Sequence, residues 1–125
     1  MDPRIVLVLA RIDDTLDRPL SIAELAATVN LSPSRLAHLF TAEVGMPPAR
    51  YLHHRRLGRA RVLLERTFLS VKQVMTAVGI NDPSHFARDF RRFHGIGPSE
   101  LRRQSWSGDR SRRPPPTDSH IGQQI

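Results

Sequence analysis

The stretch PARYLHHRRLGRARVLLER, residues 48–66, decides the fold, because similar residue patterns precede and follow it. Pro48 suits the first position of a helix, and apolar residues then recur at helical spacing. We therefore expect one helix of roughly 28 Å, at ~1.5 Å per residue. Its expected packing positions are Tyr51, Leu52, Leu57, Ala60, Leu63 and Leu64. This helix is predicted to connect two similar units.

The segments on either side of the connector resemble each other closely, with a constant offset from Pro33 onward. In the first segment, Ser21 and Glu24 form a capping-box pattern, Ser32-Pro33 can begin a second helix, and Gly45 can end it. The second segment has the matching residues Ser70, Gln73, Asp82, Pro83 and Gly95. Two short helices joined by a tight turn are typical of a helix-turn-helix. The sequence therefore predicts two such units.

A further helix is predicted before the first unit, because Asp2 can cap it and Pro3 suits its first position. Its inward stripe is expected to be Ile5, Leu9, Ile12 and Leu16. Val6 and Val8 fall off this stripe. They are either ordinary exposed residues or part of a surface that meets another domain or subunit.

These elements predict an all-α protein with two homeodomain-like three-helix subdomains, each containing a helix-turn-helix and joined by the long connecting helix. The expected boundaries within a single domain of residues 1–104 are about 3–46, 48–66 and 68–104. The remaining segment, 105–125, has no apolar period and is rich in Ser, Pro, Arg and Gln. It is predicted to be a disordered tail.

Charge is distributed unevenly along the chain. Residues 1–33 carry three Arg against five acidic residues, whereas residues 34–104 carry thirteen Lys plus Arg against five. Nearly all of the basic residues are arginines, whose planar guanidinium groups suit phosphates and guanine edges. The excess is consistent with nucleic-acid binding, although a basic solvated surface would have the same composition.

The sequence contains no recognisable catalytic or metal-binding pattern. It has no cysteine, no nucleophile placed beside a base and no phosphate-binding loop. His53 and His54 are adjacent, so on a helix they diverge by about 100° and cannot readily chelate one ion. We expect neither an enzyme nor a cofactor or metal. The apolar run Ile5–Ala10 is too short to span a membrane, and a cytoplasmic protein is expected.

The second helix of each unit has apolar residues at helical spacing, which we expect to be buried. They are Leu36, Leu39, Phe40 and Val44 in one unit and Phe86, Phe90 and Phe93 in the other. Their burial would turn the remaining residues of these helices outward. Arg can bond two acceptors on guanine, and Ser or His can reach a base edge singly. The outward residues that we expect to contact bases or phosphates are Ser34, Arg35, His38, Ser84, His85, Arg88, Arg91 and Arg92. Each is alternatively an ordinary exposed side chain.

The arrangement resembles the DNA-binding domain of the AraC/XylS family of bacterial transcriptional regulators, over about Ser21 to Arg103. The matching pattern includes Gly45-Met46-Pro47-Pro48-Ala49-Arg50-Tyr51-Leu52, then Ser84-His85-Phe86, Phe90-Arg91, and Gly95 through Pro98 to Leu101-Arg102. The resemblance implies that the positions facing the DNA groove are Ser34, Arg35, Ala37 and His38 in the first unit and Pro83, Ser84, His85 and Arg88 in the second.

The sequence departs from the family pattern at several positions. His38 stands where Arg is usual, so the second unit, through Arg88, is expected to carry more of the specificity. Ile80 stands where Phe is usual and Leu101 where Tyr is usual, which preserves an apolar core. Pro47 and Gly97 stand where Ser is usual.

Together, the residues and the resemblance predict a transcriptional regulator that binds double-stranded promoter DNA sequence-specifically, with two recognition helices in successive major grooves. It would be found in the bacterial cytoplasm and associated with the nucleoid when bound. The alternative is a helical interaction module that contacts RNA polymerase or another acidic partner without reading bases. Many family members carry a separate effector-binding or dimerisation domain, which would lie outside this chain.

Overall fold

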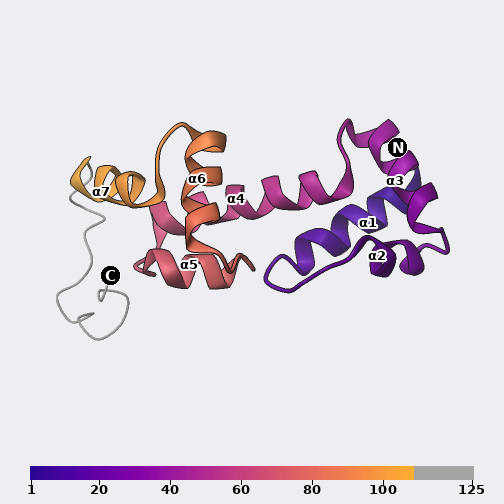
Figure 1. Ribbon diagram of the computed structural model, residues 1–125, viewed down its shortest axis with the longest axis horizontal. Helices are drawn as coiled ribbons and strands as arrows, with labels where there is room; N and C mark the ends of the chain where they lie inside the picture. Colours follow the sequence, from indigo (N-terminus) through magenta and orange to yellow (C-terminus); the bar gives the residue numbers. More distant parts are fainter. Residues whose placement is uncertain (109–125) are drawn as a thin grey trace. The chain divides into compact units, whose positions relative to one another are not determined.

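A computed structural model describes residues 1–108 of the chain, apart from the side chains of residues 107 and 108. Over this range the protein is all-helical, with no strand (Figure 1). The helices are α1 (Pro3–Asp14), α2 (Ile22–Thr28), α3 (Pro33–Val44), α4 (Pro48–Arg66), α5 (Val71–Ala77), α6 (Pro83–His94) and α7 (Pro98–Gly108). The expected all-α fold is therefore confirmed, and the connector has the predicted bounds.

The chain divides into two compact units, Met1–Arg55 and Arg56–Ile125, here called unit 1 and unit 2. The division falls within α4, which contributes to both hydrophobic cores. Tyr51 and Leu52 pack against the core of unit 1, while Leu57, Ala60 and Leu64 are buried in the core of unit 2. The first part of the connector thus packs on one core and its second part on the other.

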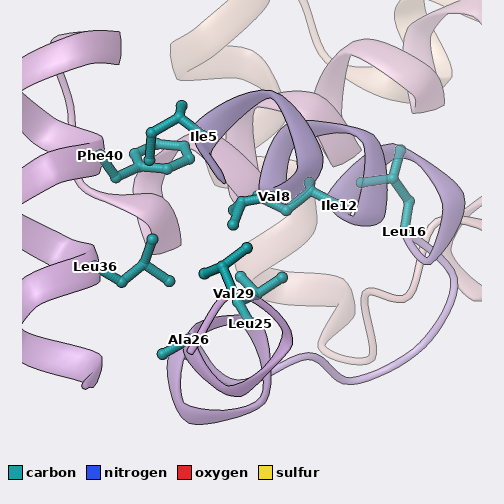
Figure 2. Packing of buried hydrophobic residues seen from close by; sticks show 9 residues of the cluster. All are labelled: Ile5, Val8, Ile12, Leu16, Leu25, Ala26, Val29, Leu36 and Phe40. Atoms are coloured by element: carbon teal, nitrogen blue, oxygen red, sulfur yellow. The ribbon is translucent and has the colours of Figure 1, made fainter. Parts of the chain in front are cut away.

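The core of unit 1 is formed by α1, α2 and α3, whose apolar side chains point toward one another (Figure 2). Its buried residues are Ile5, Val8, Ile12, Leu16, Leu25, Ala26, Val29, Leu36 and Phe40. One expectation is corrected here, because Val8 is fully buried whereas Leu9 is only partly buried. Val8 and Leu9 lie on opposite edges of one helical stripe, and packing against α2 and α3 favours the Val8 edge. Val6 is exposed.

The core of unit 2 is formed by the second part of α4 with α5, α6 and α7, and it closely repeats the core of unit 1. Eight buried positions match in chain order, and only Leu16 and Leu101 have no counterpart. The matching pairs are Ile5 and Leu57, Val8 and Ala60, Ile12 and Leu64, Leu25 and Val74, Ala26 and Met75, Val29 and Val78, Leu36 and Phe86, and Phe40 and Phe90. The sequence repeat is therefore a repeat of core positions.

Phe93 does not complete the buried aromatic ridge expected on α6, since 43% of it is exposed. It lies in the last turn of the helix, next to His94. The His94 ring packs against Phe90, with ring centroids 4.4 Å apart, and its Nε2 lies 2.9 Å from the carbonyl oxygen of Leu57. A carbonyl can only accept, so Nε2 is the donor, and this histidine ties α6 to α4.

The predicted helix caps are present in both units. Ser21 with Glu24, and Ser70 with Gln73, form complete capping boxes. Both helix-turn-helix turns contain a residue with positive φ, which is Asn30 (58°) in unit 1 and Gly79 (77°) in unit 2. Asparagine and glycine tolerate this left-handed conformation better than other residues, so both turns are compatible with their sequences.

The C-terminus of α4 is held by Arg102, a side chain to which the sequence assigned no role. Only 7% of Arg102 is exposed. Its Nε donates to the carbonyl oxygen of Leu64 at 2.8 Å, and its Nη2 donates to that of Leu69. The guanidinium also lies over the Trp106 ring, 4.4 Å from the centroid. Burial lowers the pKa of this guanidinium, and the hydrogen bonds to carbonyls offset the cost of placing a charge there.

The last helix ends later than the predicted boundary at residue 104, since α7 continues to Gly108. Trp106 lies within it and packs edge-to-face on Phe68, with ring centroids 5.5 Å apart. This aromatic pair gives the end of α7 a partner that the polar sequence around it does not suggest. The rest of the predicted tail, 109–125, lies outside the described residues.

We expect Arg102→Ala to destabilise unit 2 by roughly 3 kcal/mol, because it removes the donors from the buried carbonyl group of Leu64 and the partly buried one of Leu69. Trp106 is the only tryptophan, so urea unfolding followed by its fluorescence reports on this unit. Arg103→Ala, which alters an exposed neighbour, is the matched control and should change stability by less than about 0.5 kcal/mol. Equal unfolding midpoints for the two variants would contradict the role of Arg102.

Candidate nucleic-acid interface

The second helix of each helix-turn-helix presents the residues expected to face DNA. In α3, Leu36 and Phe40 are buried, so the residues on the other side of the helix point toward solvent. Ser34, Arg35 and His38 are exposed, and Ala37 is half-buried beside them. In α6, burial of Phe86 and Phe90 has the same effect. Its exposed residues are Pro83, Ser84, His85, Arg88, Arg91 and Arg92. We call Ser34, Arg35, Ala37 and His38 the α3 face, and Pro83, Ser84, His85 and Arg88 the α6 face.

On the α3 face, His38 is anchored to its own helix. Its Nδ1 lies 3.0 Å from the carbonyl oxygen of Ser34, which can only accept, so Nδ1 is the donor. His38 is exposed, and its Nε2 makes no hydrogen bond with any residue in 1–108. In a neutral imidazole this atom is an acceptor, which suits the exocyclic amino group of cytosine or adenine.

On the α6 face, His85 is anchored by a carboxylate. Its Nδ1 lies 2.8 Å from Oδ2 of Asp82, whose Oδ1 accepts from the backbone N–H groups of Ser84 and His85. The pKa of Asp82 is lowered, chiefly by the hydrogen bond from the His85 backbone. Asp82 is therefore ionised as the predicted cap of α6, and its charge is directed at the helix terminus and His85.

Two arginines on these faces have unengaged guanidinium groups. The side chains of Arg35 and Arg88 make no hydrogen bond or ion pair with any residue in 1–108. Since Arg35 aligns with His85 and His38 aligns with Arg88, each face carries one unengaged arginine and one anchored histidine, in opposite order. The arginine comes in the first turn of α3 but in the second turn of α6.

Arg91 is less available than Arg88, because its Nη2 lies 3.3 Å from Oε1 of Glu100 in α7. A Cβ at position 97 would lie only 3.1 Å from that same Nη2, so Gly97 leaves room for the Arg91 guanidinium. These residues lie along a shallow hollow of about 270 Å³ that also includes Ala87 and Arg103. Arg92 is exposed beside it.

Two arginines of α4 are bound within their own units. Arg55 pairs with Asp13 of α1 at 2.9 Å in unit 1. In unit 2, Arg61 pairs with Glu65 at 3.1 Å, and its Nη1 lies 3.4 Å from Nδ1 of His94. These two guanidinium groups are therefore already paired with carboxylates of their own unit.

Sequence reasoning overlooked Arg4, whose side chain lies beside Arg35 and His38 along one hollow. Arg4 lies early in α1, far from the helix-turn-helix in sequence, so no sequence pattern indicated that it would lie next to α3. Over the described range, 1–108, no group of three or more His, Asp or Glu residues could hold a metal ion. No helix in this range is both long and apolar enough to cross a membrane.

The comparisons with known proteins agree with this geometry. Residues 25–104 match the family described as "Helix-turn-helix domain". A transcriptional regulator from Chromobacterium violaceum, described as containing an AraC-type DNA-binding domain, has a crystal structure that is 32% identical with a TM-score of 0.77, over 82% of this chain and 92% of that one. The crystal structure of the DNA-binding domain of AdpA in complex with a target DNA has a TM-score of 0.80 at 25% identity, over 86% and 96% of the two chains.

These findings place the chain among helix-turn-helix domains with two such units. More particularly, it belongs to the AraC/XylS family, as its sequence pattern suggested. The Arabinose operon regulatory protein of Escherichia coli is 37% identical over 103 residues, which are 82% of this chain and 35% of that protein. The chain spans about a third of the length of the curated relatives that it matches, for example 27% of the transcriptional regulator GbdR of Pseudomonas aeruginosa and 37% of the Arabinose operon regulatory protein of Salmonella typhimurium.

The acid dependence of stability tests the capping role of Asp82. Because its pKa is lowered in the folded state, the carboxylate contributes stability that is complete above about pH 4 and is lost as the pH falls through the folded-state value. Asp82→Asn keeps a capping oxygen but has no charge. We expect wild type to be more stable than this variant at pH 6, with the difference shrinking as the pH falls below about 4, as measured by Trp106 fluorescence in urea. A difference independent of pH would contradict this role.

Proposed function

We propose that the chain is the DNA-binding part of a transcriptional regulator and recognises specific sequences in double-stranded promoter DNA. The observation that carries this proposal is the matched pair of outward faces, each with an unengaged arginine and a histidine fixed by its own helix. The similarity to the AdpA domain, which was crystallised with a target DNA, supports it. So do the relatives that are described as transcriptional regulators.

In this proposal, α3 and α6 enter successive major grooves. Successive grooves on one side of B-DNA are about 34 Å apart, and α4, at roughly 28 Å, is of that order. Arg88 and Arg35 would each bond guanine O6 and N7, while Nε2 of His38 and of His85 would meet neighbouring bases. Ser34 and Ser84 would bond base edges or phosphates. Because arginine and histidine occur in opposite order, we expect the two subsites to differ in sequence.

Arg91 and Arg92 are assigned to the DNA backbone. Arg92 is exposed near the end of α6, and Arg91 forms an ion pair with Glu100. Phosphate contacts contribute affinity and salt dependence without reading sequence. We infer that the chain acts by binding and not by catalysis, needs no cofactor, and works in the bacterial cytoplasm on nucleoid DNA.

The rest of the regulator is also a matter of proposal. A separate effector-binding or dimerisation domain would fit the relatives, of whose length this chain spans only about a third. RNA polymerase is a second proposed partner, because an activator bound to promoter DNA would lie close to it. The alternative function, a helical module that contacts RNA polymerase or another acidic partner without reading bases, uses the same basic surface.

The role of Arg88 is tested on a site selected from a random DNA pool. Arg88→Ala should weaken binding to this site by about 1 to 3 kcal/mol and relax the preference at one base pair, because it removes a bidentate contact to guanine. Arg92→Ala is the matched control and should weaken selected and random duplexes alike. Equal losses on both duplexes for Arg88→Ala would show that Arg88 contacts only the backbone.

The two functions are separated by titrating the chain against random duplex at several salt concentrations. A DNA-binding domain should bind at low salt, with an affinity that falls linearly on a logarithmic scale as salt rises. Absence of binding even at low salt would favour the interaction module. Fluorescence anisotropy of a labelled duplex measures both outcomes.

A further inference from the structure

Unit 1 has a basic hollow of about 350 Å³ beside the α3 face. It is lined by Arg4 of α1, Leu31 of the helix-turn-helix turn, and Arg35, His38 and Leu39 of α3. Two of these five residues are arginines, and none is acidic. The hollow therefore combines two residues proposed to read bases with a third basic group from a different helix.

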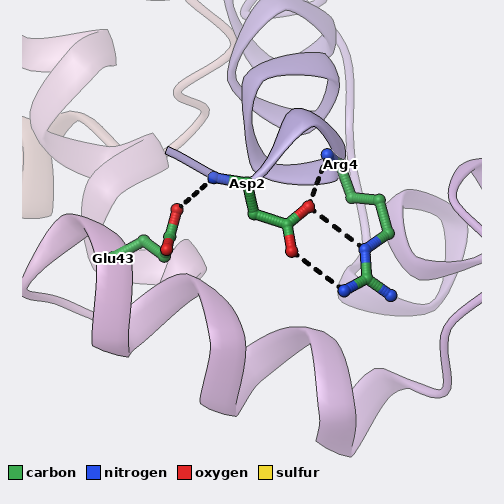
Figure 3. Close-up of polar contacts among 3 residues, drawn as sticks. All are labelled: Asp2, Arg4 and Glu43. Carbon is green, nitrogen blue, oxygen red and sulfur yellow. Dashed lines mark hydrogen bonds and ion pairs between the residues drawn. The ribbon is translucent and has the colours of Figure 1, made fainter.

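Arg4 is held in a fixed position by Asp2 (Figure 3). Its Nε lies 3.2 Å from Oδ1 of Asp2, and its Nη2 lies 2.9 Å from Oδ2. Asp2 is itself fixed, because its Oδ1 caps the backbone N–H of Arg4 at 2.8 Å and its own N–H donates to Oε1 of Glu43 at 2.6 Å. The orientation of Arg4 is thus set from α1 and α3 together.

This anchoring leaves part of the guanidinium available. A guanidinium has five N–H donors, and the two bonds to Asp2 use two of them. The Arg4 side chain is 48% exposed and lies along the hollow. Because its orientation is already restricted, it would lose less conformational freedom on binding an anion than a free surface arginine would.

The position of the hollow indicates the kind of anion. If Arg35 and His38 point into the major groove, a cation beside them on a neighbouring helix lies toward the edge of the groove, where phosphodiester oxygens line both strands. We propose that Arg4 binds a DNA backbone phosphate next to the subsite contacted by α3. This inference rests on the proposed function and adds a contact from α1.

The test compares Arg4→Ala with Arg11→Ala, which removes an exposed arginine from the same helix outside the hollow. Loss of one phosphate contact should lower the salt slope of log K by about 0.9, which corresponds to roughly eightfold weaker binding at 0.1 M salt. We expect this loss for Arg4→Ala on selected and random duplexes alike. Arg11→Ala should change affinity less than about twofold.

A second variant keeps the proposal falsifiable if Arg4→Ala perturbs folding. Arg4→Lys keeps a positive charge at this position. If Arg4 meets a phosphate, this variant should keep most of the salt slope that Arg4→Ala loses. If Arg4→Lys, folded as wild type, loses as much salt slope as Arg4→Ala, the proposal is overturned.

A third arm distinguishes DNA from free phosphate. Inorganic phosphate is titrated into the chain without DNA, with the His38 ring observed by NMR, for wild type and Arg4→Ala. An effect of Arg4→Ala on phosphate binding but not on duplex binding would overturn the proposal. An unchanged salt slope in Arg4→Ala, while Arg88→Ala still relaxes specificity, would overturn it and leave the proposed function intact.

Discussion

Burial of an aromatic residue in the second helix of each helix-turn-helix is the constraint on which the outward faces depend. Phe40 in α3 and Phe90 in α6 are fully buried, each about one turn after another buried residue, Leu36 or Phe86. Two buried positions four residues apart fix the rotation of a helix about its own axis. Once that rotation is set, the α3 face and the α6 face must point toward solvent. Core packing therefore determines which side chains are available to read bases.

The two units repeat the core far more faithfully than they repeat the surface. Eight buried positions match in order, whereas the outward positions exchange arginine for histidine. The ion pair of Arg91 and Glu100 also has no equivalent, because Thr41 and Arg50 stand at the matching places in unit 1. A duplicated core with divergent surfaces is what two different subsites would require. The scaffold is shared, and the outward side chains differ.

Most of the fold followed from local rules, because the decisive residues act on their immediate neighbours. The two serine capping boxes, the Asp82 cap and the left-handed glycines Gly45 and Gly95 were all predictable from the sequence. The exposure of the candidate site residues, apart from half-buried Ala37, was predictable for the same reason, since it follows from helical periodicity. Their contact with DNA stays a prediction.

The features that the sequence did not disclose depend on partners far away in the chain. Val8 is buried instead of Leu9 because α2 and α3 pack on that edge of α1. Phe93 stays exposed because His94 takes the place beside Phe90 and donates to a carbonyl of α4. Arg4 lies beside Arg35 and His38 only because of the tertiary packing of α1. Periodicity specifies which helix edge is apolar, but it cannot rank two edges of similar hydrophobicity.

We propose that the α3 face and the α6 face contact one side of a DNA duplex. Dimethyl sulfate protection of guanine N7 on a selected duplex tests it directly, because arginine bonded to N7 blocks methylation. The account predicts two clusters of protected guanines, about one helical turn apart, one lost in Arg35→Ala and the other in Arg88→Ala. A single cluster that both variants alter equally, or no protection of N7 on a duplex that is bound, would contradict it.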